Sequence, residues 1–165
     1  MKYFKLTNET IVNALGIKLF RIELTIDCKW GKSGDKGGFI EKESNLSGNA
    51  WVYGDAQVYG NARVYGNARV YGDARVYGDA RVYGDTWKES PLQIQGTNHY
   101  VNFCKKGVLR IGCIELDTKT WVKVFEEKGE EHGYTKKQIK EYSLYIKLAI
   151  EIEKLQTKLK KEAKI

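Results

Sequence analysis

The chain is poor in proline, histidine and cysteine, and each scarcity narrows what it can be. Its three cysteines, Cys28, Cys104 and Cys113, are an odd number without a CxxC spacing, which indicates reduced thiols rather than a disulfide framework. No apolar run reaches the roughly 20 residues that a membrane span requires. The first residues are too polar for the apolar core of a signal peptide. We therefore expect a cytoplasmic protein with no membrane association.

Positive charge is unevenly distributed along the chain. The formal net charge is +7, and the excess of Lys and Arg lies in residues 1–39 and 135–165, whereas the middle of the chain is nearly balanced. A basic surface attracts anionic ligands or nucleic acid, although a Lys-rich terminal helix is commonly just a solvated surface. Non-specific nucleic-acid binding would weaken steeply with salt, and the balanced middle disfavours it.

A six-residue repeat dominates this middle region. Six units that begin at Val52 and recur through Val82 read Val-Tyr-Gly-(Asp/Asn)-(Ala/Thr), and two degenerate units from Ile40 and Leu46 precede them. A step of six does not keep Val on one face of a helix, but alternation within a unit places Ala and Val on the same side of a strand. Gly next to Asp or Asn allows a tight corner. The pattern predicts short strands that turn repeatedly about one axis.

If three units form one coil, side chains eighteen residues apart stack on neighbouring coils. The small Val and Ala core would end in open sheet edges, so we expect capping segments and self-association. An Arg between two indoles would contribute about 0.5–2 kcal/mol. The expected columns are Tyr53 over Tyr71, Tyr59 over Tyr77, Tyr65 over Tyr83, Arg63 over Arg81, Asp55 over Asp73, and Trp51, Arg69 and Trp87 in one line.

The flanking segments predict further elements. Residues 3–7 and 17–27 are expected to form strands, and the Gly-rich residues 31–40 a turn into the first coil, because they lack the Walker spacing of a phosphate loop and precede a strand. After Pro91, strands are expected at 92–95, 99–104 and 107–116. Asp117 is a candidate N-cap for one helix, and a Thr135–Gln138 capping box for a second, from Lys136 towards Lys161.

The last predicted helix carries two apolar stripes. We expect one to pack on the strands and the other to meet a partner helix, although two heptads are a short coiled-coil signal. The stripes are Tyr145, Leu148, Ile152, Leu155 and Leu159, and Ile139, Tyr142, Ile146, Ala149 and Ile150.

The stretch GDKGGFIEKESNLSGNAWVYG and the repeat after it resemble a family of small phage and prophage hexapeptide-repeat proteins, often labelled polymer-forming. The six-residue pattern is similar to that of the left-handed parallel β-helix. The resemblance implies a mainly β protein: an N-terminal β cap (1–39), a short left-handed parallel β-helix of hexapeptide repeats (40–87), and an α+β C-terminal domain of strands plus two helices (88–165). It also implies the cytoplasm of an infected or lysogenic bacterial host, and it supplies no activity.

Catalysis is disfavoured by the lack of histidine in the repeat. Hexapeptide acyltransferases use a catalytic His by the coil, and carbonic anhydrases of this fold need three on zinc, whereas this chain has only His99 and His132, both outside the repeat. A nucleophilic pair of Cys104 or Cys113 with a His is an alternative, but Cys in an alternating strand is more often a buried small hydrophobe. Asn at three of the seven Gly corners disfavours calcium binding. We expect no enzyme activity, metal or cofactor.

Two functions remain open. The first is capture of an anionic small molecule, such as a nucleotide signal of bacterial immunity that a phage protein sequesters, because Tyr stacks on bases and Arg forms forked bonds to phosphate. The Tyr and Arg side chains also suit any soluble strand surface. Grooves between the copies of a homotrimer would be lined by Tyr65, Arg69, Tyr71, Arg75, Tyr77, Arg81 and Trp87 of the repeat and by His99, Lys105 and Arg110.

The second function is a rigid trimerising spacer whose C-terminal domain binds and inhibits a host or phage protein. The regularity of the repeat favours this alternative, because ligand sites usually interrupt a pattern and these units barely vary. The same regularity places a ligand site more naturally in the C-terminal domain or at a subunit interface than on one coil.

Overall fold

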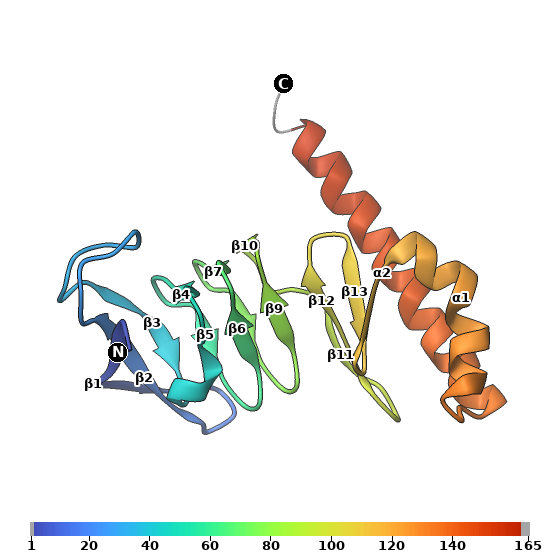
Figure 1. Ribbon diagram of the computed structural model, residues 1–165, viewed down its shortest axis with the longest axis horizontal. Coiled ribbons are helices and arrows are strands. Elements are labelled where there is room, and N and C mark those ends of the chain that lie inside the picture. The colour runs from blue at the N-terminus through green and yellow to red at the C-terminus, as the bar shows by residue number, and fades with distance from the viewer. Residues whose placement is uncertain (1, 163–165) are drawn as a thin grey trace. The chain divides into compact units, whose positions relative to one another are not determined.

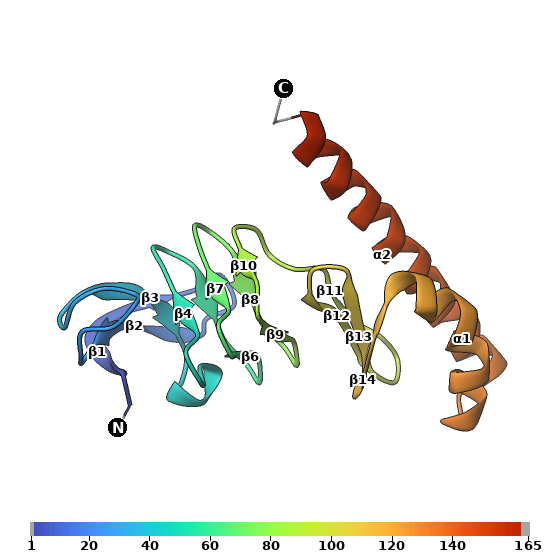
Figure 2. The ribbon, with the colours of Figure 1, turned by 45° about the horizontal axis from the view of Figure 1, so that its top comes forward.

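The computed structural model describes residues 2–162, with side chains through residue 158. The chain divides into two compact units, residues 1–91 and 92–165 (Figures 1 and 2). The first consists almost wholly of strands, and the second combines a four-stranded sheet with two helices. None of the described helices is long and apolar enough to cross a membrane.

The repeat forms a parallel β-solenoid with three sides. Each side pairs strands whose residues are eighteen apart, such as Trp51 with Arg69, so that three six-residue units make one coil, as predicted. The first side pairs β4 (Trp51–Val52) with β7 (Arg69–Val70), the second β5 (Gln57–Val58) with β8 (Arg75–Val76), and the third β6 (Arg63–Tyr65) with β9 (Arg81–Tyr83).

The solenoid interior contains the Val and Ala of every unit. The valines from Val52 to Val82 are fully buried, and the alanines that precede them are at most 2% exposed. Each corner uses a Gly with positive φ, for example Gly60 at +68°. A Cβ on Gly60 would lie 3.2 Å from the backbone nitrogen of Gly78, so the corner geometry and the close stacking of coils both require Gly there.

The predicted tyrosine columns are confirmed. The rings of Tyr53 and Tyr71 stack at 4.1 Å between centroids with an angle of 6° between their planes. The other two columns are also stacked, at 5.5 Å for Tyr59 with Tyr77 and at 5.1 Å for Tyr65 with Tyr83.

The expected line of Trp51, Arg69 and Trp87 is wrong at its last member. The third strand on this side, β10 (Thr86–Trp87), pairs Thr86 with Arg69 and Trp87 with Val70, a separation of seventeen residues instead of eighteen. Trp87 therefore occupies the register position of the buried valines and is 8% exposed. The cause lies in the last unit, because its next apolar residue follows Val82 after five positions.

An antiparallel hairpin of β1 (Phe4–Val12) and β2 (Lys18–Leu24), here called the N-terminal hairpin, leads into the solenoid. Strand β3 (Lys36–Ile40) pairs antiparallel with β2 and parallel with β5, so Ile40 begins the first coil opposite Val58. A short 3-10 helix, η1 (Glu43–Asn45), follows. A Cβ on Gly37 would come within 2.7 Å of Val52 and Trp51, so the Gly-rich stretch allows β3 to pack closely against the coil.

The second unit begins with a meander of four antiparallel strands rather than the three expected. The predicted strand 107–116 is split into two strands by a turn at Gly112, whose φ is +59°. Tyr142 of the last helix is buried within this unit, and its hydroxyl donates to the carbonyl of His99, just before β12, at 2.8 Å. The strands are β11 (Gln93–Gln95), β12 (Tyr100–Lys105), β13 (Val108–Ile111) and β14 (Ile114–Asp117).

Both predicted helices are present with their predicted caps. In α1 (Thr118–Glu131) the carboxylate of Asp117 accepts a hydrogen bond from the backbone nitrogen of Thr120. In α2 (Lys136–Glu162) Thr135 and Gln138 exchange side-chain to backbone bonds. The inward stripe contains the buried Tyr142, Ile146 and Ala149, whereas Leu148 and Leu155 of the other stripe are 47% and 57% exposed, and the side chain of Leu159 lies outside the described residues.

Candidate functional site

The outward side chains of the solenoid form one column on each side. On two sides the first coil is covered by the N-terminal segment: Arg21 lies 4.1 Å from the ring centre of Phe39, and Trp51 is only 1% exposed. On the third side, Arg63 lies directly below Arg81, and both are exposed. A ligand could therefore be bound on the outward face of the third side and on the parts of the other two sides that the N-terminal segment leaves uncovered.

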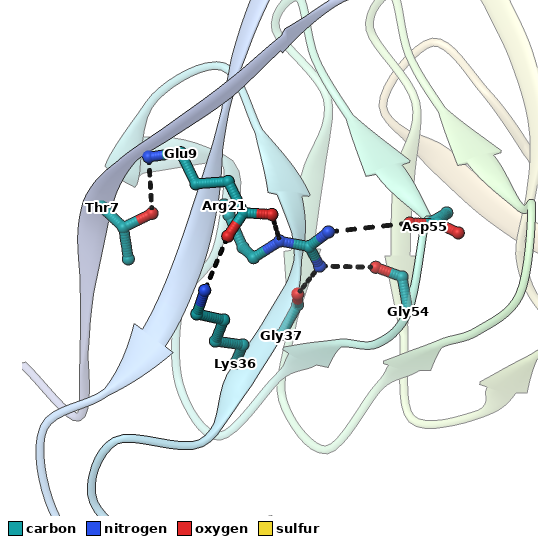
Figure 3. A network of polar contacts seen from close by, with 7 residues as sticks. All are labelled: Thr7, Glu9, Arg21, Lys36, Gly37, Gly54 and Asp55. Atoms are coloured by element: carbon teal, nitrogen blue, oxygen red, sulfur yellow. Dashed lines mark hydrogen bonds and ion pairs between the residues drawn. The ribbon is translucent and has the colours of Figure 1, made fainter.

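Arg21 joins the N-terminal hairpin to the first coil (Figure 3). Its guanidinium donates to the carbonyls of Gly37 at 2.9 Å and Gly54 at 3.3 Å, and its Nε lies 2.5 Å from the carboxylate of Glu9. Asp55, at the corner that follows β4, lies 3.8 Å away. Contacts with Lys36 and Arg21 lower the pKa of Glu9. All three nitrogens of the guanidinium are thus directed at the junction between the N-terminal hairpin and the first coil, which makes this network structural.

A second cationic cluster lies on the side of β4 and β7. Trp30, from the loop before β3, has the guanidinium of Arg69 at 4.7 Å and the ammonium of Lys29 at 4.3 Å from its ring centres. Lys29 also donates to Asn67 at 2.6 Å. Arg69 therefore contacts Trp30, an aromatic partner that the repeat pattern did not predict. In the sequence, the only sign of this contact is an isolated Trp beside a Gly-rich stretch.

The tyrosine columns stabilise the coil through ring stacking. Tyr53 and Tyr71 are too close for a base to insert between them, so a ligand can reach these rings only from outside the column. Burial beside Tyr71 raises the pKa of Tyr53 well above its usual range. Tyr53 is consequently neutral at physiological pH, and the positive charge of this surface comes from Arg and Lys.

The predicted ligand residues fall into two groups, one in each unit. Tyr77 and the arginines of the first group are exposed, Tyr65 and Tyr71 are half-buried, and Trp87 is buried. In the second group, His99 and Lys105 are exposed, whereas Arg110 is 8% exposed on β13 with Glu115 of β14 3.7 Å from its Nε. The group in the repeat is Tyr65, Arg69, Tyr71, Arg75, Tyr77, Arg81 and Trp87, and the group in the second unit is His99, Lys105 and Arg110.

A small pocket in the second unit brings His99, Cys113 and His132 together. Its volume is about 40 Å³, enough for a few water molecules. His99 Nδ1 lies 2.5 Å from the hydroxyl of Tyr134, and burial raises the pKa of Tyr134 to about 12. Cys104 is buried on β12 and does not line this pocket. Within the described part of the chain, no group of three or more His, Cys, Asp or Glu is arranged to hold a metal ion.

The model of one protein family, described as YdcK Beta solenoid repeat, matches residues 56–72, 62–76 and 74–88 of the chain. These overlapping stretches lie within the solenoid and its last coil. A comparison with curated proteins gives no match. The family match and the observed strand pairing agree that the chain is a β-solenoid repeat protein, with mainly strands and two C-terminal helices.

Proposed function

We propose that this is a non-enzymatic binding protein whose solenoid captures an anionic small molecule of the nucleotide class. The observation that carries the proposal is the side formed by β6 and β9. There Arg63 and Arg81 form an exposed column, and the stacked Tyr65 and Tyr83 follow them at the corner. Guanidinium groups and aromatic rings thus lie next to each other on the same side of two consecutive coils.

Electrostatics explains why such a column favours an anion. Arg63 and Arg81 occupy adjacent strands about 4.8 Å apart, so their charges repel each other. A phosphate placed between the two guanidinium groups would accept hydrogen bonds from both and remove that repulsion. The tyrosines at the corner would then contact the base from outside their column.

The assembly belongs to the same proposal. A single convex side leaves a small ligand largely in solvent, whereas pockets bury most of a ligand's surface. Association of three copies in a homotrimer would supply the opposite wall of a groove. In this proposal the solenoid is left-handed, the N-terminal hairpin caps its first coil, and the protein acts in the cytoplasm of a phage-infected or lysogenic bacterium, where it sequesters a nucleotide immune signal.

Native mass spectrometry of protein purified from bacteria with nucleotide-based immune systems is the first test. We expect a nucleotide-sized adduct that is lost on denaturation. Titration calorimetry with ATP, a cyclic dinucleotide and ADP-ribose should then show binding to the ligand-free protein. If no adduct is retained and none of these ligands gives a heat of binding, the proposal is wrong.

Paired variants locate the site. Replacement of both Arg63 and Arg81 with Gln should weaken nucleotide binding by about tenfold or more, because charge-assisted hydrogen bonds are worth about 1.5–3 kcal/mol each. The matched control replaces the exposed Lys18 and Lys140 with Gln, which removes the same charge elsewhere. Equal losses in both double variants would show that net charge alone, and not this column, attracts the ligand.

A second candidate function is the binding of a protein partner through α2. It is favoured by Leu148 and Leu155 of the exposed stripe, which are 47% and 57% exposed, and by Leu144, which lies outside both predicted stripes and is 59% exposed. Exposed apolar stripes commonly mark interaction surfaces. A stoichiometric partner that co-purifies with the protein, and is lost when Leu148 and Leu155 are replaced with Gln, would support this function over ligand capture.

A further inference from the structure

A groove of about 400 Å³ lies within the second unit, between the start of α1 and the distal half of α2. The two helices lie side by side there, and α2 continues beyond α1 (Figures 1 and 2). Volumes of about 300–1,000 Å³ are typical of small-molecule sites. The groove is ten times larger than the pocket at His99. Its lining residues are Thr118 and Lys119 of α1 and Ile150, Glu153, Lys154, Thr157 and Lys158 of α2.

The charge of the lining is positive. Three of the lining residues, Lys119, Lys154 and Lys158, carry an ammonium group, and one, Glu153, carries a carboxylate. The carboxylate accepts a 2.6 Å hydrogen bond from the hydroxyl of Thr118, which fixes it at the α1 side of the groove. With three positive charges and one negative charge, the groove favours an anion.

The ion pair that Lys154 makes does not prevent this ammonium group from binding an anion. Lys154 lies 2.7 Å from Glu151, but both side chains are more than two-thirds exposed, and such pairs are worth little in water. The ammonium of Lys154 can therefore exchange Glu151 for a ligand at low cost. The backbone amides of α1 are not required, because Asp117 already caps that helix end.

Besides the ammonium groups, the groove has apolar groups that could contact an uncharged part of a ligand. Ile150 is half-buried in the lining, and the methylene stems of the lysines add apolar surface below their charged ends. The hydroxyl of Thr157 donates to the carbonyl of Glu153 at 2.8 Å, which turns its methyl group away from that bond. A ligand that matches this lining has an apolar body and one anionic end.

We propose that this groove is a binding site for a small organic anion of the phosphate-monoester class. The apolar body of the ligand contacts Ile150, and its phosphate is bound by Lys119, Lys154 and Lys158. The site lies in a different unit from the solenoid surface and does not depend on it.

Titration calorimetry with 1-naphthyl phosphate tests the groove, with 1-naphthol and inorganic phosphate as separate probes. We expect the ester to bind more tightly than either, because only the ester has both a phosphate for the ammonium groups and an apolar body for the apolar part of the lining. Equal binding of inorganic phosphate and the ester would overturn the apolar part of the proposal. Absence of binding by the ester would overturn the whole proposal.

Two sets of variants locate the binding. Replacement of Lys154 and Lys158 with Gln should weaken binding of the ester at least about fivefold, from the loss of two exposed ionic contacts. The matched control replaces Lys140 and Lys147, which are exposed on the same helix but outside the groove, and should retain full affinity. Equal weakening in both sets would contradict the site.

A further variant separates charge from folding. Glu153→Gln keeps an acceptor for Thr118 but removes the one negative charge of the lining, so it should tighten binding of the ester. Unchanged or weaker binding would contradict the electrostatic argument. The Arg63 and Arg81 double variant distinguishes this proposal from the solenoid site, because it should impair nucleotide capture and leave binding of 1-naphthyl phosphate in the groove unchanged.

Discussion

Arg21 shows how a single side chain can determine the junction between two structural elements. It is 18% exposed, stacks on Phe39 and donates to carbonyls of Gly37 and Gly54, which belong to β3 and to the solenoid corner after β4. The flat, forked guanidinium makes these contacts together, whereas an ammonium is a single point charge. Because these contacts depend on the shape of the guanidinium, a substitution that keeps only its positive charge should not preserve them.

We predict that Arg21→Lys weakens the junction. Loss of the stacking and of at least one charge-assisted bond should cost about 1–3 kcal/mol, and hydrogen exchange of the β1 and β2 amides should accelerate about tenfold to a hundredfold. Hydrogen-exchange mass spectrometry of peptides from residues 4–24 measures this change. Arg63→Lys, at an exposed position, is the matched control and should leave those peptides unchanged. Equal exchange in both variants would refute the structural role of Arg21.

At the scale of elements, Tyr142 connects α2 to the sheet of the second unit. Its side chain is fully buried, and its hydroxyl accepts from the backbone nitrogens of Asn98 and His99 while it donates to the His99 carbonyl. A Cβ on Gly96 would lie 2.4 Å from that oxygen, so the β11–β12 turn is built closely around it. The turn therefore depends on a hydroxyl group supplied by a helix 43 residues later in the sequence.

We predict that Tyr142→Phe destabilises the second unit by about 1–3 kcal/mol, because two backbone donors lose a buried acceptor. Tyr145→Phe is the matched control. The Tyr145 hydroxyl donates to the half-buried carboxylate of Glu141 at 2.9 Å, and its removal should cost less than about 1 kcal/mol because it leaves no backbone donor without an acceptor. Urea denaturation followed by helical circular dichroism measures both changes. A similar stability for the two variants would contradict the role assigned to Tyr142.

The solenoid could be predicted from the sequence because its order is local. Each unit of six carries its own strand, corner and inward residues, so the spacing fixed the coil and the pairing of Tyr53 with Tyr71. The same logic explains the error at Trp87. The prediction assumes that the six-residue spacing continues past Val82, but the next apolar residue comes one position early.

The groove could not be predicted because its parts come from distant elements. Lys154 and Lys158 are four residues apart on one helix face, a spacing that is visible in the sequence but typical of any solvated helix. Thr118 and Lys119 gain significance only when α1 packs beside that face. The contact between Arg69 and Trp30 has the same cause, since a loop outside the repeat brings the indole to the coil.

At the scale of the whole molecule, the solenoid has too few coils to stabilise itself through stacking alone. Repeats gain stability from their neighbours, and here one side has only the two paired strands β6 and β9, while another has the three strands β4, β7 and β10. The outward Arg63 and Arg81 also place two like charges on neighbouring coils. Association between copies can bury the column and provide a counter-charge, so it would add stability as well as form the proposed nucleotide groove.

We therefore predict a homotrimer in solution. Light scattering after size-exclusion chromatography should give about three times the chain mass of 18.9 kDa, and the thermal midpoint should rise with protein concentration, because association stabilises only the folded chain. A monomer at every concentration would contradict this prediction and remove the second wall of the solenoid groove. It would leave the α1–α2 groove unaffected, since that site is complete within one chain. The oligomeric state thus decides whether the protein can use the solenoid site, whereas the α1–α2 groove is available in either state.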